Sequence, residues 1–330
     1  MSDGGALQVL DGTHLRALDL TLPPPPDLHS GLSGSHLLHI AHSRVSASLF
    51  GLSLPQPLTA TALTRLPAAS DRDAFLSADF DQEKASQILR DYVTAIADEL
   101  KDNPLVVSVL DGSTLHLLLE DEDDFAMLAE NLFTDLDVED KGKISKSQIQ
   151  NALSQMGVEM GVPPFSEFPQ LNDLLRKHGA DGDEELGQAQ FAQLLQSVLQ
   201  DLEVELSKKN VVYIHNIQII NGSKLRQVLG NEKELNSIVE KALKENAEAK
   251  EGVASIEIIR SFLERNAKEL GLPRSEANEA VVLLYDDVFT EVAKGKGSAE
   301  LEKEELVKLV KDILERLAEQ LQSNPIFEEA

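Results

Sequence analysis

The sequence predicts an all-α fold built from repeated helix-loop-helix units. Apolar residues recur at helical spacing along most of the chain, and one short phrase occurs three times. Among the 330 residues, aromatic side chains make up only 4% and tryptophan is absent. The cores must therefore be mainly aliphatic, which favours packed helices over β-sandwiches.

Composition excludes several classes of function. The formal net charge is -27, so direct binding of nucleic acid, which depends on Lys and Arg meeting phosphate, is not expected. Cysteine is absent, which removes thiolate nucleophiles, disulfides and Cys-ligated metal sites. We find neither a secretory signal nor an apolar run of the ~20 residues that a membrane span needs. We therefore expect no membrane partner and a cytoplasmic location, with the nucleus as a further possibility.

The repeated phrase defines the domain organisation. It reads VLDGTHLRALDL from Val9, VLDGSTLHLLL from Val109 and IINGSKLRQVL from Ile219. Asp111 and Asn221 are 110 residues apart (221 − 111), and the same offset relates Gly142 to Gly252 and Gly161 to Gly271. We expect an interrupted first repeat over 1–107, a complete repeat over 108–218 and a second complete repeat over 219–330.

Each complete repeat contains four segments of helical apolar spacing. In the second repeat these segments cover residues 123–133, 147–156, 168–178 and 190–206, and the third repeat has counterparts such as 275–292 and 304–321. The repeated phrase precedes the first helix. There Asp111 or Ser113 can cap the helix, and the intervening glycine makes the turn into it.

Composition changes abruptly over residues 22–70. This stretch begins with LPPPP and contains no Asp or Glu between His29 and Ser70, although the chain as a whole is acidic. We interpret it as a disordered insertion in the first repeat. A segment introduced by an error in the gene model, or an embedded targeting-like stretch, is the alternative.

Two loops in the second repeat have the length and residue types of a calcium loop. Calcium prefers six to eight oxygen ligands, which a twelve-residue loop supplies from positions 1, 3, 5, 7 and 12, with Gly at position 6. In Asp137–Gln148, Asp137 and Glu139 occupy positions 1 and 3, and the backbone carbonyl of Lys143 occupies position 7. However, Lys141 stands at position 5 and Gln148 at position 12, so ligand charge is reduced.

The other loops retain less of this pattern. In Gly179–Gln190, Asp181 and Asp183 hold positions 3 and 5, but glycine stands at position 1 and glutamine at 12. The loops 247–258 and 294–305 of the third repeat lack most of the acidic positions, and we expect neither to bind calcium. The predicted metal ligands are therefore Asp137, Glu139, Lys143, Asp181 and Asp183, with Ca²⁺ bound more weakly than about 10⁻⁵ M if it is bound.

Together, the VLDGS repeats and the Gly-Ile turn resemble the plant EF-hand proteins. The most similar members are calcium sensors that interact with stress-activated, sucrose-non-fermenting-related protein kinases. The resemblance covers about residues 70–330 and the short head at 7–21. It implies tandem EF-hand-like pairs, calcium as the ligand and a stress-activated protein kinase as the partner that the protein restrains.

No paired nucleophile and base, phosphate-binding glycine loop or histidine cluster of catalytic type is found, so we expect no enzymatic activity and no catalytic residues. The first hypothesis is a calcium-binding regulator that modulates a kinase, with calcium opening a groove at Leu132, Phe133, Leu153 and Met156. The alternative is a calcium-independent scaffold of the same fold. Positions 5 and 12 of the first loop discriminate between the two hypotheses.

Overall fold

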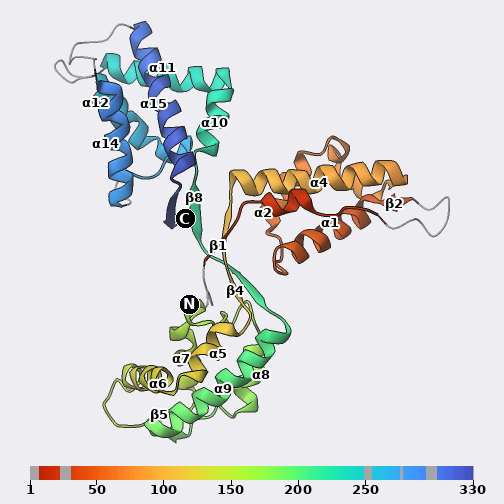
Figure 1. Cartoon of the computed structure of the whole chain (residues 1–330), viewed down its shortest axis with the longest axis vertical. Helices are drawn as coiled ribbons and strands as arrows, with labels where there is room; N and C mark the ends of the chain where they lie inside the picture. The colour runs from red at the N-terminus through yellow and green to blue at the C-terminus, as the bar shows by residue number, and fades with distance from the viewer. Residues whose placement is uncertain (1–6, 23–30, 249–254, 276–277, 295–302, 330) are drawn as a thin grey trace. The chain divides into compact units, whose positions relative to one another are not determined.

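The computed structural model describes the chain except for residues 1–6, 23–30, 249–254, 276–277, 295–302 and 330. The described chain is mostly helical, which confirms the helical class, and its strands are short (Figure 1). It forms two compact units, one of Met1–Lys101 with Val106–His215 and the other of Asp102–Leu105 with Asn216–Ala330. None of the helices in the described ranges has the length and apolar composition of a membrane span.

Three successive modules make up these units, and we name them by their order in the chain. The first module contains β1 (Gln8–Leu10), η1 (Thr13–Ala17), β2 (Leu32–Ser33), α1 (Gly34–Ser48), α2 (Gln56–Thr64), η2 (Pro67–Ala69), α3 (Arg72–Ser77), β3 (Asp79–Phe80) and α4 (Gln82–Asp102). The second contains β4 (Leu105–Leu110), α5 (Ser113–Glu120), α6 (Glu122–Leu136), β5 (Ile144–Ser145), α7 (Gln148–Met156), η3 (Val158–Met160), α8 (Gln170–Lys177), β6 (Glu185–Leu186), α9 (Gln188–Lys208) and β7 (Val211–Ile214). The third contains β8 (Ile217–Ile220), α10 (Ser223–Gly230), α11 (Glu232–Glu248), α12 (Ser255–Arg265), α13 (Ala267–Leu270), α14 (Glu279–Ala293), α15 (Lys303–Ser323) and β9 (Ile326–Glu329).

The repeated phrase forms the same turn in every module. In the second module the side chain of Asp111 accepts a hydrogen bond from the backbone N–H of Ser113 at 3.0 Å, and Asn221 accepts one from Ser223 at the same distance. Hydrogen bonds from the Ser113 hydroxyl and backbone N–H hold the pKa of Asp111 below its ordinary value. The phrase starts the first helix as predicted, but the expected side-chain cap is wrong, because the glycine itself occupies the N-cap position and no side chain caps the helix.

A glycine brings each turn against the last helix of its module. Gly12, Gly112 and Gly222 have left-handed φ angles of 75°, 89° and 72°. A Cβ on them would lie 2.5, 2.7 and 2.7 Å from the carbonyl oxygens of three residues, Ala97, Glu203 and Ala318. These three residues stand at the same place in helices of 21 residues each, 15 positions after the first residue (97 − 82, 203 − 188 and 318 − 303). The same contact between turn and helix therefore recurs three times along the chain.

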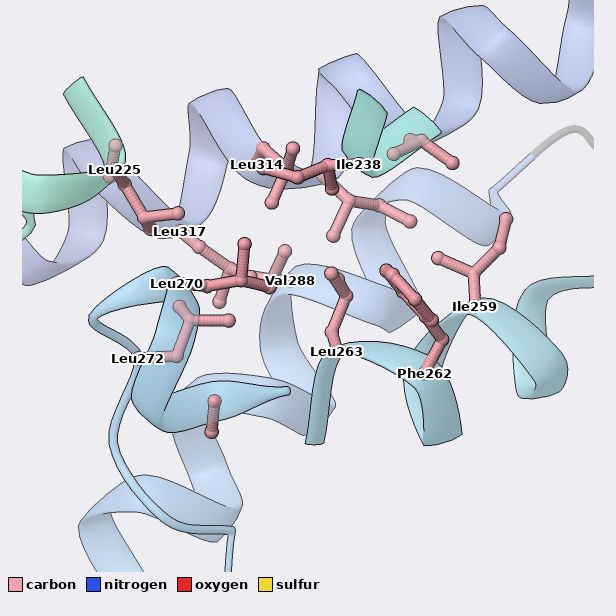
Figure 2. Close-up of a cluster of buried hydrophobic side chains, with 14 of the residues drawn as sticks. Leu225, Ile238, Ile259, Phe262, Leu263, Leu270, Leu272, Val288, Leu314 and Leu317 are labelled. Carbon is pink, nitrogen blue, oxygen red and sulfur yellow. The ribbon is translucent and has the colours of Figure 1, made fainter. Parts of the chain in front are cut away.

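Beneath the turns, aliphatic stripes on the last helices form the cores. On α9, Phe191, Leu195, Leu199 and Leu202 are completely buried. In the third module, Leu314 and Leu317 of α15 meet Leu263, Leu270 and Val288 from the three preceding helices (Figure 2). Aliphatic burial of this extent provides the main stabilisation of each module.

Part of the predicted disordered segment is helical instead. Residues 31–70 contain α1 and α2, whereas residues 23–30 lie outside the described residues. On α1, Leu37, Ala41 and Val45 repeat every four residues and are at most 1% exposed. Composition alone predicts disorder here, because the segment has few charged residues. The helical spacing of its apolar residues nevertheless provides the buried surface that folding needs.

The same segment completes the first module. β2 and β3 pair antiparallel with Leu32 opposite Phe80, as β5 and β6 do with Ile144 opposite Leu186. The hydroxyls of Ser33 and Ser35 are 3.0 Å apart, and those of Ser145 and Ser147, at the matching positions, are 2.8 Å apart. Residues 31–70 are thus the middle of a shortened module and not an insertion.

The glycine contact leads to a stability prediction for Gly222→Ala. The added methyl group would meet the Ala318 carbonyl, and the left-handed φ disfavours alanine, so we expect a loss of about 2 kcal/mol or more in the unfolding free energy of the third module. Gly230→Ala is the matched control, because nothing lies within 4 Å of a Cβ at the end of α10. Hydrogen exchange of peptides from residues 223–323 in a urea series measures the effect. Equal stability of the two variants would contradict the prediction.

Candidate metal loops of the second module

Two loops of the second module are held side by side by a short antiparallel ladder. Residues Ile144 and Ser145 of β5 face Leu186 and Glu185 of β6. Further backbone bonds run from the N–H of Lys146 to the carbonyl of Glu184 at 2.9 Å and from the N–H of Ser147 to that of Gly182 at 3.1 Å. Ile144 and Leu186 are buried beneath the loops, so the ladder is anchored in the apolar core.

Asp137, the first residue of the first loop, turns its carboxylate inward. It follows α6, and its two carboxylate oxygens accept backbone hydrogen bonds from Lys141 at 3.0 Å and from Gly142 at 2.6 Å. Asp140 and Gly142 adopt positive φ angles of 51° and 70°, which close the loop. The predicted turn chemistry of Asp137 and Gly142 is therefore present.

Two other acidic side chains of the loops form ion pairs with lysines. The ammonium of Lys141, at position 5, forms an ion pair with Glu139 at position 3. Across the ladder, Lys146 forms an ion pair with Glu184 of the second loop. Both carboxylates are exposed, so each pair contributes little to stability, but each places positive charge in a loop that calcium would have to enter.

The amide side chains at position 12 are also engaged within the protein. The Oε1 atom of Gln148 accepts a hydrogen bond from the Nδ2 of Asn151 at 2.7 Å. That of Gln190 accepts one from the backbone N–H of Gly187 at 3.1 Å and so caps α9. Neither glutamine can supply the two charged oxygens of the usual glutamate.

The remaining predicted ligands are Asp181, Asp183 and the backbone carbonyl of Lys143. Asp181 and Asp183 are exposed in the second loop, and Lys143 is exposed in the first. In the part of the chain that the structure describes, no group of three or more histidine, aspartate or glutamate side chains is arranged to hold a metal ion. The loops of the third module lie largely outside the described residues, at 249–254 and 295–302.

Below the loops, the side chains expected to line an opened groove are packed together. Leu132, Phe133, Leu153 and Met156 are each at most 6% exposed. The rings of Phe133 and Phe191 meet edge to face with centroids 5.7 Å apart. The paired loops therefore cover a closed apolar core.

A polar contact that the sequence pattern did not predict fixes the start of the second loop. Asp201 of α9 accepts a hydrogen bond from Lys177 at 2.5 Å, and its Oδ2 lies 2.7 Å from the Nε2 of His178. The Lys177 contact, followed by that of His178, lowers the pKa of Asp201. The adjacent basic residues that end α8 were the available signal, but the partner is 23 residues away and could not be inferred from local spacing.

This contact predicts a pH-dependent effect of Asp201→Asn. Because the folded-state pKa of Asp201 is depressed, its contribution is present above the ordinary carboxyl pKa and is lost as pH falls through the lowered value. We expect the variant to unfold at lower urea concentration than the wild type at pH 7, and the difference to shrink below about pH 4. Urea midpoints at several pH values measure this. A difference that stays constant with pH would contradict it.

Comparison with known proteins adds no relative: no family model, curated protein or solved structure gives a significant match to this chain.

Proposed function

We propose that this chain is a non-enzymatic interaction protein whose second module retains an EF-hand-like pair of loops without requiring calcium. The observation that supports this most directly is that side chains at the calcium-ligand positions already interact with other groups of the protein. Both position-12 amide oxygens accept internal hydrogen bonds, and Lys141 pairs with the acidic residue at position 3. The loops are joined instead by the β5–β6 ladder and its buried apolar residues.

Charge counting supports the same proposal. The first loop offers carboxylates at positions 1 and 3 only, and its ion pair with Lys141 offsets one of them. Sensor loops reach affinities of about 10⁻⁷ to 10⁻⁵ M with more acidic ligands and a bidentate glutamate. A loop with two fewer carboxylates should remain empty at the calcium concentrations of a resting or stimulated cell.

The partner that we propose is another protein. The kinase-regulating proteins that the repeats resemble suggest a stress-activated protein kinase as the first partner to test, with inhibition as the expected effect. No catalytic role for this chain is included in the proposal. The net charge of this chain is -27, which favours a partner with a basic surface.

A calcium-responsive regulator is the second candidate function, and one observation favours it. The inward carboxylate of Asp137 and the left-handed Gly142 preserve the turn at the start of the first loop. In that case calcium would open the loop pair and expose Leu132, Phe133, Leu153 and Met156.

Isothermal titration of the full chain with calcium distinguishes the two functions. We expect no calcium-specific heat up to millimolar ion, with magnesium titrated in parallel as the control. Saturable calcium binding in the micromolar range, accompanied by binding of an apolar dye, would contradict the proposal and support the sensor.

A double substitution tests whether the two departures from the ligand pattern are the cause. Lys141→Asp with Gln148→Glu supplies an acidic group at position 5 and a bidentate carboxylate at position 12, so we expect calcium binding in the range of about 10⁻⁷ to 10⁻⁵ M. Lys143→Asp with Gln150→Glu is the control, because it adds similar charge at exposed positions that offer no side-chain ligand. Equal gains in both variants would show that net charge, and not the ligand positions, limits binding.

A further inference from the structure

The last strand of the chain, β9, corresponds to β4 but has a different set of neighbours. The helix α4, the strand β4, the helix α15 and the strand β9 share one register, with an offset of 221 residues (326 − 105). β4 lies in the middle of the sheet β1-β4-β7 and pairs along both edges. Within the described residues, β9 pairs with β8 alone (Figure 1).

The two strands also differ in how their faces are covered. Ile326 of β9 belongs to the core of the third module, whereas the next residue, Phe327, is 51% exposed. At the equivalent place in β4, Val106 is only 1% exposed. Side chains alternate between the two faces of a strand, so Phe327 marks a face of β9 that lacks the cover found on β4.

A backbone hydrogen bond shows how the outer edge of β4 is used. The carbonyl of Val106 accepts a hydrogen bond from the N–H of His215, at the end of β7, at 2.8 Å. The register equates Val106 with Phe327, so the Phe327 carbonyl has the position of an acceptor for an added strand. The neighbouring Glu329 carbonyl receives only a long contact of 3.5 Å from Arg274, which an added strand can replace.

Charge and composition indicate which strand fits this edge. Glu328 is held by Arg274, but Glu329 is exposed, and a second copy of β9 would place further glutamates against it. The strand that fills the corresponding edge of β4 belongs to the segment 208–215, Lys-Lys-Asn-Val-Val-Tyr-Ile-His. It combines two lysines with a run of β-branched and aromatic residues, which suits an acidic edge next to an exposed phenylalanine.

We propose that the outer edge of β9 binds an extended, basic and apolar segment of a partner protein by strand addition, with Phe327 as the apolar anchor. The added strand would continue the β8–β9 sheet as β7 continues the sheet beyond β4. This inference rests on the proposed role as an interaction protein and assigns it a surface and a partner chemistry. It does not depend on the loops of the second module, so the calcium titration and the experiment below can fail independently.

Fluorescence anisotropy with a labelled peptide of the sequence of residues 208–215 tests the proposal on the full chain. We expect saturable binding to the wild type and at least a tenfold weaker affinity for Phe327→Asp, which replaces the apolar anchor with a small, charged side chain. The same peptide with proline in place of Tyr213 should not bind. In β7 the N–H of Tyr213 faces the same edge as that of His215, and proline cannot donate this backbone hydrogen bond. Leu283→Asp is the matched control, since Leu283 is 55% exposed on α14 of the same module, and it should bind as the wild type does.

Three results would overturn the proposal. The first is the absence of peptide binding to the wild type, and the second is binding that Phe327→Asp or the proline peptide leaves unchanged. The third, from sedimentation velocity, is a dimer of the unliganded chain that dissociates in Phe327→Asp, which would assign the edge to a second copy. Circular dichroism melting of both aspartate variants establishes that they are folded before binding is measured.

Discussion

Close approach of a glycine to the last helix determines how each module closes. At Gly112 and Gly222 a side chain would collide with a helix carbonyl, so the turn can sit against the helix only because the Cβ is missing. This contact places the strand before the glycine beside the strand after the helix, and the two pair in an antiparallel ladder. The ends of the module are thereby joined, and the helices between them are confined to one compact core.

The loops of the second module show that fold and ligand chemistry can be separated. The residues that support the loop pair are Ile144 and Leu186 in the ladder and Phe133 and Phe191 beneath it. None of them supplies an oxygen ligand. Lysine or glutamine at a ligand position therefore leaves the apolar anchoring intact, which explains how the paired loops persist beside the Lys141–Glu139 ion pair.

The sequence allowed the module register and most helices to be predicted, because both depend on local signals. The Asp-Gly-Ser phrase encodes a turn by itself, and the helical spacing of Ile149, Leu153 and Met156 gives α7 directly. The lack of acidic residues predicts disorder where α1 forms, although Leu37, Ala41 and Val45 have the period of a buried face. The pairing of Asp201 with His178 and the packing of Gly222 against Ala318 depend on residues distant in the chain, so local patterns could not predict them.

The strand β4 has a consequence for how such a chain can change over time. It ends the first module and begins the second, so a cut at this point removes a strand from whichever module is left without it. Between the second and third modules, by contrast, β7 and β8 are separate strands with His215 and Asn216 between them. A recombination break at residues 215–216 would therefore leave every module with its own strands, whereas a break at β4 would leave one of the first two modules a strand short.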